Sequence, residues 1–356
     1  MFAEQMNAHS GIGYLMIHAP TFLRSDVIVL CLPVRSLTPP PTSLGDPSMT
    51  VTTEAAAVAG AIPTVSSPPD VPFEVVPLSG NLGAEILGLD LRTLDDGVTA
   101  AVRAAWLHYK VVFFPGQNLT PREHLAFARR FGEPTEGHPV IPGLADQPEV
   151  FQIDYTQVRE LAAVYGNVSD VSRGLDWHTD VTFVKRPPLG SILRAVEVPR
   201  AGGDTLFSNQ EAAFDDLSPA LQGFLSTLTA VHDGEDQFKA VLDLLGEGRW
   251  EGKTFTKLEA VEHPVVRTHP ETGKRSLFVN PGFTSHIKEL QRAESDALLA
   301  FLYQHSVRPE FTVRYHWQPG TIGFWDNRAT QHAVVGDFGD AHRVIQRVTL
   351  RGDEPR

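Results

Sequence analysis

The chain has 356 residues, of which 42% are hydrophobic and 21% charged, and its formal net charge is −13. A chain of this length buries roughly three quarters of its unfolded surface, so it can form a large core as one or two domains. The acidic balance argues against a protein that binds nucleic acids, because such proteins present a basic face to the phosphate backbone. It is compatible with a small anionic substrate that one or two arginines hold.

The chain contains one cysteine, Cys31. A single thiol forms neither an intrachain disulfide nor a thiolate metal site, which favours a reducing compartment. The apolar run 26–34 is much shorter than the roughly 18–20 residues of a membrane span, and no small-residue cleavage site follows it. We therefore expect a cytoplasmic protein that does not bind membranes.

Residues 1–72 differ from the rest of the chain. They are rich in Pro, Ser, Thr and Ala and show no hydrophobic periodicity. This composition predicts a disordered or linker tail, followed by one domain at 73–356. Because Met49 offers a second plausible start, an upstream extension over residues 1–48 stays open as an alternative.

The predicted elements begin at Phe73 and include helices and many short strands. Helices are expected at 95–110, from the capping box Thr120–Glu123 to about Phe131, after Ser218-Pro219, and around 297–305. Strands are expected at 73–78, 84–91, 111–114, 149–153, 191–198, 205–208, 264–268, 277–280, 312–317, 321–325 and 344–350. Short strands between Gly and Pro turns favour a sandwich or jelly roll, so the predicted fold class is mainly β with flanking helices.

Spacing among the 14 histidines points to a metal site. His178-Thr-Asp180 is the one His-x-Asp in the sequence. On a strand, residues i and i+2 share a face, so both side chains would reach one ion. The similar His269-Pro-Glu271 lies in a turn-like segment and is expected to be structural.

His332 is the candidate third ligand, at the edge where a predicted strand ends in a polar turn. Two imidazoles and one carboxylate form a facial triad that leaves coordination positions open and suits non-haem Fe(II) oxygenases. Arg343 and Arg347 then share one face of the last predicted strand. Two readings stay open: inward-facing arginines that bind anions, or solvated arginines on an edge strand.

Several motifs in this order resemble the taurine dioxygenase family of Fe(II)- and 2-oxoglutarate-dependent enzymes. They are Trp177–Phe183, Gly202–Leu206, His263–Pro270, Leu277–Phe283 and Trp325–His332 followed by Arg343. The resemblance runs from about Phe73 to the C-terminus. It implies a double-stranded β-helix (jelly roll), with His178, Asp180 and His332 as iron ligands.

The resemblance also implies the cofactors and the reaction. Fe(II), 2-oxoglutarate and O2 are expected, with ascorbate as an in vitro reductant, and Arg343 and Thr205 would bind the far carboxylate of 2-oxoglutarate. Decarboxylation of 2-oxoglutarate to succinate and CO2 would drive hydroxylation of the carbon that bears sulfur. A sulfonate would then release sulfite and an aldehyde, and a sulfate ester would release sulfate. A homo-oligomer is expected on the same ground.

Taurine-oxidising members of the family bind their substrate through residues that correspond to His138, Phe283 and Arg347, and the backbone N–H of Val181 offers a further donor. We therefore expect these four residues to contact a small anionic substrate.

This chain departs from those members at Ile141, Gly174 and Gly234, where they carry a tyrosine, an asparagine and an aromatic residue. We expect a site that keeps its anion end but is apolar and wider where the taurine amine would lie. Taurine, another alkylsulfonate, an alkyl sulfate ester and a carboxylate stay open as substrates. A jelly-roll binding protein without activity is disfavoured, because no ligand of the triad is missing.

Overall fold

The computed structural model describes residues 69–156 and 177–356. The predicted tail lies outside these ranges up to residue 68, as does Gly174. Within them, the helices are α4 (Asp96–Tyr109), α5 (Pro121–Ala128), α7 (Gln210–Asp215), α8 (Pro219–Leu225), α9 (Glu235–Leu245), α10 (Arg292–Ser306) and the 3₁₀ turn η2 (Pro309–Phe311). None of the described helices is both long and apolar enough to span a membrane.

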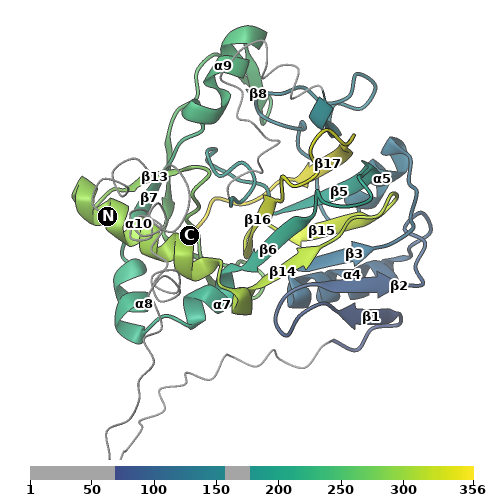
Figure 1. Cartoon of the computed structure of the whole chain (residues 1–356), viewed down its shortest axis with the longest axis horizontal. Coiled ribbons are helices and arrows are strands. Elements are labelled where there is room, and N and C mark those ends of the chain that lie inside the picture. The colour runs from purple at the N-terminus through teal and green to yellow at the C-terminus, as the bar shows by residue number, and fades with distance from the viewer. Residues whose placement is uncertain (1–68, 157–176) are drawn as a thin grey trace, which may run out of the picture. The chain divides into compact units, whose positions relative to one another are not determined.

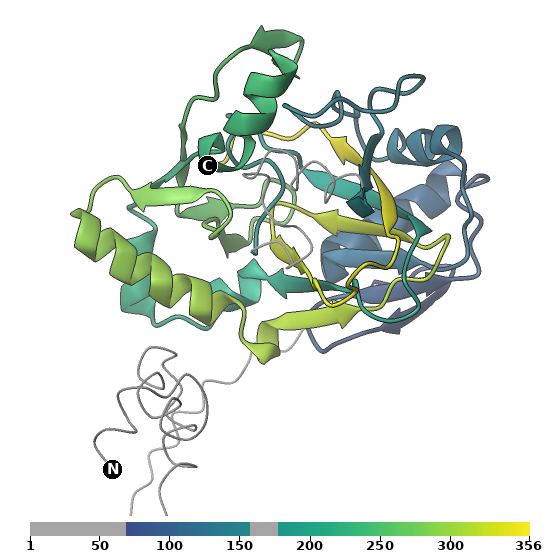
Figure 2. The same cartoon turned by 45° about the horizontal axis from the view of Figure 1, so that its top comes forward.

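Two facing sheets carry the predicted jelly roll (Figures 1 and 2). The larger has the order β1 (Glu74–Pro77), β2 (Ala84–Leu87), β3 (Val111–Phe114), β15 (Ile322–Asp326), β5 (Gly190–Glu197), β17 (Val344–Leu350) and β4 (Phe151–Asp154). The smaller has the order β14 (Thr312–Tyr315), β6 (Thr205–Asn209) and β16 (Thr330–Val334). Neighbouring strands are antiparallel except β2 and β3, and the jelly-roll prediction is confirmed.

Side chains alternate between two cores across the larger sheet. On β3, Val112 and Phe114 join the core that α4 and α5 cover, whereas Val111 and Phe113 face the smaller sheet. This alternation is the period of a strand that is buried on both faces. The helices α4 and α5 therefore cover the outer face of the larger sheet, and the site lies on its inner face, between the two sheets.

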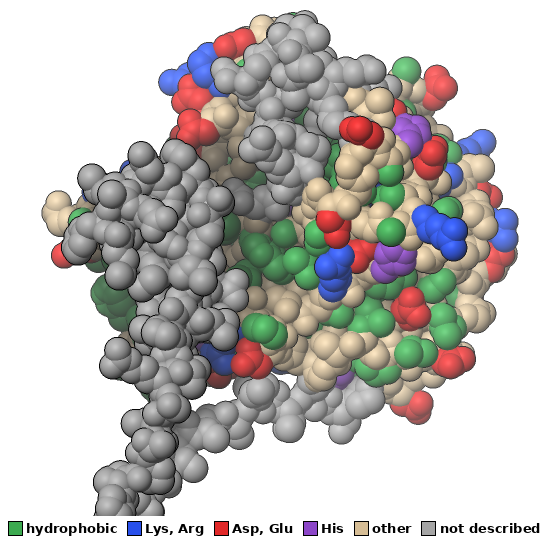
Figure 3. Space-filling model, in the orientation of Figure 1, with side chains coloured by type: hydrophobic (Ala, Val, Ile, Leu, Met, Phe, Trp, Pro, Cys, Tyr) green, Lys and Arg blue, Asp and Glu red, His purple; other side chains and the backbone are tan. Residues whose placement is uncertain are grey.

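Shorter elements flank the two sheets. They are β7 (Thr229–His232), β10 (Val261–Pro264) and β13 (Thr284–Ile287) in one sheet, the pair β11 (Val266–Thr268) and β12 (Arg275–Leu277), and the pair β8 (Gly248–Trp250) and β9 (Lys253–Phe255). Figure 1 shows α9 and β8 together, away from α7, α8 and α10. Figure 3 shows Lys and Arg side chains interspersed with Asp and Glu on the described surface of one face, with no continuous basic patch there.

Some predicted boundaries are wrong, each for a local reason. β2 ends at Leu87, because Gly88 turns the chain with a φ of 79°. The predicted strand 264–268 is two strands, because β10 pairs with β7 whereas β11 pairs with β12. A strand was predicted at 277–280, but the observed strand β12 lies earlier and ends at Leu277.

Two elements near the site were not predicted. β16 is buried along its whole length, so it lacks the alternation that marks a half-buried strand. α9 follows Gly234 and has no side-chain N-cap, so its sequence lacks the N-terminal signal from which a helix start is predicted. The predicted helix around 297–305 begins earlier, at Arg292, where Glu294 accepts a hydrogen bond from the Gln291 N–H.

Candidate active site

The structure brings His178, Asp180 and His332 together between the two sheets. Their candidate ligand atoms all lie within 4.8 Å of one another. Nε2 of each histidine is 3.9 Å from Asp180 Oδ1. Among the described residues, no other group of His, Cys, Asp and Glu gathers in this way. The geometry fits two imidazoles and one carboxylate on a single ion.

The backbone places these three side chains differently from the prediction. His332 lies inside β16, not at the edge of a strand. His178 and His332 exchange two backbone hydrogen bonds, of 3.0 and 2.8 Å. His178 thus adds one residue to the edge of the smaller sheet, beside its partner ligand.

Asp180 reaches the site through a turn. The expectation that His178 and Asp180 share a strand face is wrong, because the chain turns directly after His178 and Val181 has a φ of 55°. The Thr179 hydroxyl donates to the Thr330 carbonyl at 2.8 Å, which ties the turn to β16. A left-handed Val181 is unusual for a β-branched residue and marks a conformation that its surroundings hold in place.

The protonation states suit a divalent metal ion. Burial and, to a smaller extent, the nearby His178 lower the pKa of His332 to about 3. Burial would raise the pKa of Asp180, but the Arg347 guanidinium and the two imidazoles outweigh it and hold that pKa below its usual range. His332 is therefore neutral and Asp180 ionised, the states in which an imidazole and a carboxylate bind a metal ion.

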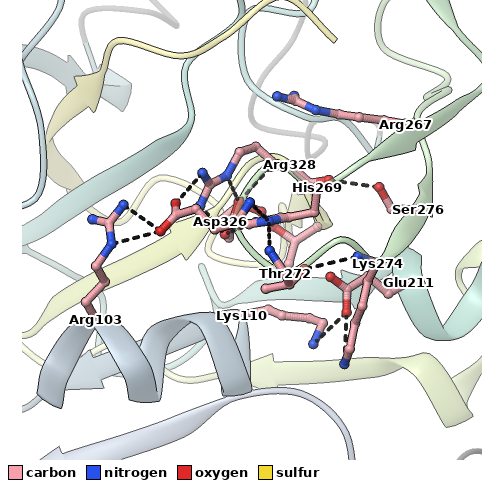
Figure 4. A network of polar contacts seen from close by, with 12 residues as sticks. Arg103, Lys110, Glu211, Arg267, His269, Thr272, Lys274, Ser276, Asp326 and Arg328 are labelled. Atoms are coloured by element: carbon pink, nitrogen blue, oxygen red, sulfur yellow. Dashed lines mark hydrogen bonds and ion pairs between the residues drawn. The ribbon is translucent and has the colours of Figure 1, made fainter. Parts of the chain in front are cut away.

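His269 is structural, as expected. Its Nε2 lies 3.0 Å from Asp326 Oδ2, and its Nδ1 accepts backbone hydrogen bonds from Glu271 and Thr272 (Figure 4). Asp326 also receives two 2.8 Å bonds from Arg328. This buried network fixes the turn between β15 and β16, and therefore the start of the strand that carries His332.

Arg343 and Arg347 both line the cavity next to the triad, together with Thr205. The volume of this cavity, including the part that is open to solvent, is about 420 Å³. β17 lies between β5 and β4, and the two arginines are only 0% and 8% exposed. The alternative of solvated arginines on an edge strand is wrong.

Arg343 is a buried cation with unused hydrogen-bond donors. Its Nε donates to the Gly203 carbonyl at 3.2 Å, and its guanidinium lies 4.8 Å from the Tyr155 ring centroid. Nη1 and Nη2 have no hydrogen-bond partner in the described ranges. Unpaired buried donors are costly, so this group is suited to a bidentate anion such as a carboxylate. Thr205 Oγ1 accepts a bond from Trp317 Nε1 at 2.9 Å, which leaves its own proton free to donate.

Arg347 and His138 both contact one aromatic ring, that of Phe151. Phe151 stacks on the His138 ring at 5.3 Å and lies 5.3 Å from the Arg347 guanidinium. Arg347 also pairs with the Asp180 carboxylate. These contacts place both cation and imidazole beside the triad.

His138 has a defined tautomer. Its Nδ1 accepts from the N–H groups of Val140 and Ile141, each at 3.2 Å, so Nε2 carries the proton and acts as a donor. Burial, reinforced by Arg347, lowers the pKa of His138 to about 3. A neutral imidazole with a fixed N–H suits an anionic oxygen.

An apolar cluster covers the site beyond these donors. Phe283 presents its edge to the His178 ring at 6.0 Å, and Phe183 lies 5.0 Å from Phe283. Phe238, on α9, packs 4.7 Å from the His138 ring and 5.2 Å from Phe183. Sequence reasoning missed Phe183 and Phe238 as lining residues, although Phe183 belongs to the motif that carries His178.

The expected widening at Gly234 is wrong. A Cβ atom on Gly234 would lie 2.7 Å from Cγ of Phe183, so the Phe183 ring already fills the space that the missing side chain would leave. Ile141 packs against the same apolar cluster. The site is therefore apolar, as expected, but it is closely packed at Gly234.

Comparisons with known proteins agree with this geometry. The family model for the taurine catabolism dioxygenase TauD, TfdA family matches residues 74–349. An alpha-ketoglutarate-dependent sulfate ester dioxygenase of Pseudomonas putida is 38% identical over 295 residues, which cover 82% of this chain and 93% of that protein. An alpha-ketoglutarate-dependent sulfonate dioxygenase of Saccharomyces cerevisiae is 34% identical, over 80% of this chain and 68% of that protein.

The solved structures give the same result. The crystal structure of a taurine dioxygenase from Burkholderia xenovorans superposes with a TM-score of 0.66 at 42% identity, covering 80% of this chain and 90% of the other. The motif order, the facing sheets, the buried triad and these relatives lead to one conclusion: the chain belongs to the TauD/TfdA family of dioxygenases.

Proposed function

We propose that this protein is an Fe(II)- and 2-oxoglutarate-dependent dioxygenase that hydroxylates the carbon attached to the sulfate oxygen of an alkyl sulfate ester, or the carbon attached to the sulfur of an alkylsulfonate. One observation carries the proposal: the buried guanidinium of Arg343 lines the same cavity as His178 and His332, and its Nη1 and Nη2 have no hydrogen-bond partner among the described residues. Two such donors beside the candidate metal ligands suit a cosubstrate that contacts both the arginine and the metal.

Each residue has a role in this proposal. His178, Asp180 and His332 hold Fe(II), and Arg343 and the Thr205 hydroxyl bind the far carboxylate of 2-oxoglutarate. When bound, Fe(II), 2-oxoglutarate and O2 supply the oxidising chemistry that removes hydrogen from a substrate carbon. The protein positions that carbon and excludes water from the site.

The substrate head and tail meet different surfaces. The Arg347 guanidinium, His138 Nε2–H and the Val181 N–H bind the anionic head. Ile141 and the rings of Phe183, Phe238 and Phe283 contact the carbon chain. Since these four side chains offer no acceptor to an ammonium group, taurine suits the site less well than a longer alkyl chain.

Product analysis tests the proposed function. Purified protein with Fe(II), ascorbate and 2-oxoglutarate is incubated separately with hexyl sulfate, hexanesulfonate, taurine and phenoxyacetate. We expect succinate to form together with sulfate from the ester or sulfite from the sulfonate. Turnover of phenoxyacetate alone would assign a carboxylate substrate, and absence of substrate-dependent succinate in all four reactions would contradict the proposal.

Chain length should increase the specificity constant. Each buried methylene contributes about 0.8 kcal/mol, and the ammonium of taurine loses a charged hydrogen bond worth about 1.5–3 kcal/mol. We therefore expect kcat/KM for a C4–C6 alkanesulfonate or alkyl sulfate to exceed that for taurine at least tenfold. Ile141→Tyr, which adds a hydroxyl where the taurine amine would lie, should shift the preference toward taurine. A preference of the unchanged protein for taurine would contradict this prediction.

Gly234 should be sensitive to a single methyl group. Gly234→Ala places its Cβ against the Phe183 ring, so the ring must move within the substrate site. We expect the KM for hexyl sulfate to rise several-fold while 2-oxoglutarate binding is unchanged. Gly223→Ala is the matched control, because a Cβ there meets no atom within 4 Å and lies on helix α8. Equal KM values in the two variants would show that Phe183 does not shape the substrate site.

A further inference from the structure

A chain of three buried hydrogen bonds ends on the candidate metal ligand Asp180. Trp325 Nε1 donates to Asn327 Oδ1 at 3.0 Å, Asn327 Nδ2 donates to Ser191 Oγ at 2.8 Å, and Ser191 Oγ donates to Asp180 Oδ2 at 2.6 Å. All four residues are at most 2% exposed. Water therefore does not compete for these groups.

Chemistry fixes the direction of this chain. An indole N–H can only donate, so the Asn327 atom that faces it must be the carbonyl oxygen. The Asn327 amide nitrogen then faces Ser191 and makes the serine oxygen an acceptor. The one serine proton is left to point at the ionised carboxylate, which can only accept.

The two oxygens of Asp180 have different surroundings. Oδ1 is the atom that lies 3.9 Å from Nε2 of both His178 and His332, and it also accepts a hydrogen bond from Arg347 Nη1. Oδ2 is the atom that the Ser191 hydroxyl holds. A carboxylate that binds a metal through one oxygen occupies one coordination position. A carboxylate that binds through both oxygens occupies two positions, and the second is one that the cosubstrate and O2 need.

We propose that Ser191 and Asn327 are positioning residues that hold Asp180 Oδ2 away from the metal, so that Oδ1 alone serves as the ligand. This inference rests on the proposed Fe(II) site, and it names the residues that shape it. Partners of this kind orient metal ligands, and losing one typically weakens metal binding about 10–100-fold.

The rest of the fold keeps the positioning chain rigid. Ser191 lies opposite Trp325 in the β5–β15 ladder. The Asn327 N–H donates to the Leu189 carbonyl at 3.1 Å. Asn327 also belongs to the turn that Asp326 and Arg328 fix in Figure 4. The buried polar network around Asp326 and Arg328 thus also supports the position of Asn327, and through Asn327 and Ser191 that of Asp180.

Metal binding without turnover tests this inference. Mn(II) is titrated into metal-free protein and its free concentration is followed by electron paramagnetic resonance. We expect Ser191→Ala to raise the Mn(II) dissociation constant about 10–100-fold. Ser295→Ala is the matched control, because Ser295 is also fully buried but lies on α10, and the hydrogen bond described for its side chain comes from the Ile287 N–H. Its dissociation constant should stay within twofold of wild type.

A second variant covers the case in which Ser191→Ala does not fold. Ser191→Cys keeps the size and a weak donor, so its Mn(II) affinity should fall several-fold. A folded Ser191→Ala, or a folded Ser191→Cys, that binds Mn(II) as tightly as wild type would overturn the positioning role. Failure of the wild-type protein itself to bind Mn(II) would instead overturn the proposed metal site.

Discussion

His332→Ala is expected to abolish turnover and to weaken Fe(II) binding by more than the 100-fold that loss of an outer partner costs. The reason is geometric: His332 supplies one of three protein ligands, and its backbone pairing with His178 fixes the distance between the two imidazoles. Anaerobic titration with Fe(II) measures the affinity. The visible charge-transfer band of the Fe(II)–2-oxoglutarate complex, which we expect for wild type, should be lost.

His178→Ala and Asp180→Ala should behave in the same way, since each removes one ligand of the triad. His286→Ala is the control, because His286 lies on β13 and contacts Ser285 instead of the triad. If His332→Ala kept both the band and full activity, another histidine would have to serve, and the assignment of the triad would be wrong.

The sequence predicted the contents of the site better than its geometry. His178, His332 and Arg343 fall in short motifs, so local spacing together with the resemblance to the family identified them, and the structure brings all three into one cavity. Ser191 and Asn327 lie 136 positions apart along the chain. Only the pairing of β5 with β15 makes them neighbours, and no local pattern records that pairing.

The fold shows the same division between local and distant signals. The capping box at Thr120 predicted the start of α5, because its hydrogen bonds involve residues three apart. The strand β16 was missed, because every residue in it is buried and the sheet that buries it is assembled from distant segments. The close packing at Gly234 also depends on distant residues, since the ring of Phe183, 51 positions earlier in the chain, fills the space beside this glycine.

Arg343→Ala is expected to raise the 2-oxoglutarate concentration needed for half-maximal activity about 10–100-fold. A charge-assisted bidentate pair is worth about 1.5–3 kcal/mol, and here the guanidinium is fully buried with two nitrogens that lack a described partner. Arg343→Lys should restore little, because an ammonium cannot reproduce the planar fork. Succinate formation at varied 2-oxoglutarate measures this effect.

Arg347→Ala separates the two arginines, although both line one cavity. Arg347 lies beside Phe151, on whose ring His138 also stacks, so its loss should raise the KM for the sulfate or sulfonate and leave 2-oxoglutarate binding near the wild-type value. The fraction of succinate that forms without substrate oxidation should increase. The reason is that a weakly bound substrate is absent from the site during part of the turnovers of 2-oxoglutarate. Since Arg347 also pairs with Asp180, Mn(II) affinity is measured in parallel, to distinguish a change at the metal from a change in substrate binding. Equal losses of 2-oxoglutarate affinity in the two variants would contradict the separation, since Arg347 pairs with the Asp180 carboxylate whereas Nη1 and Nη2 of Arg343 have no partner within the described ranges.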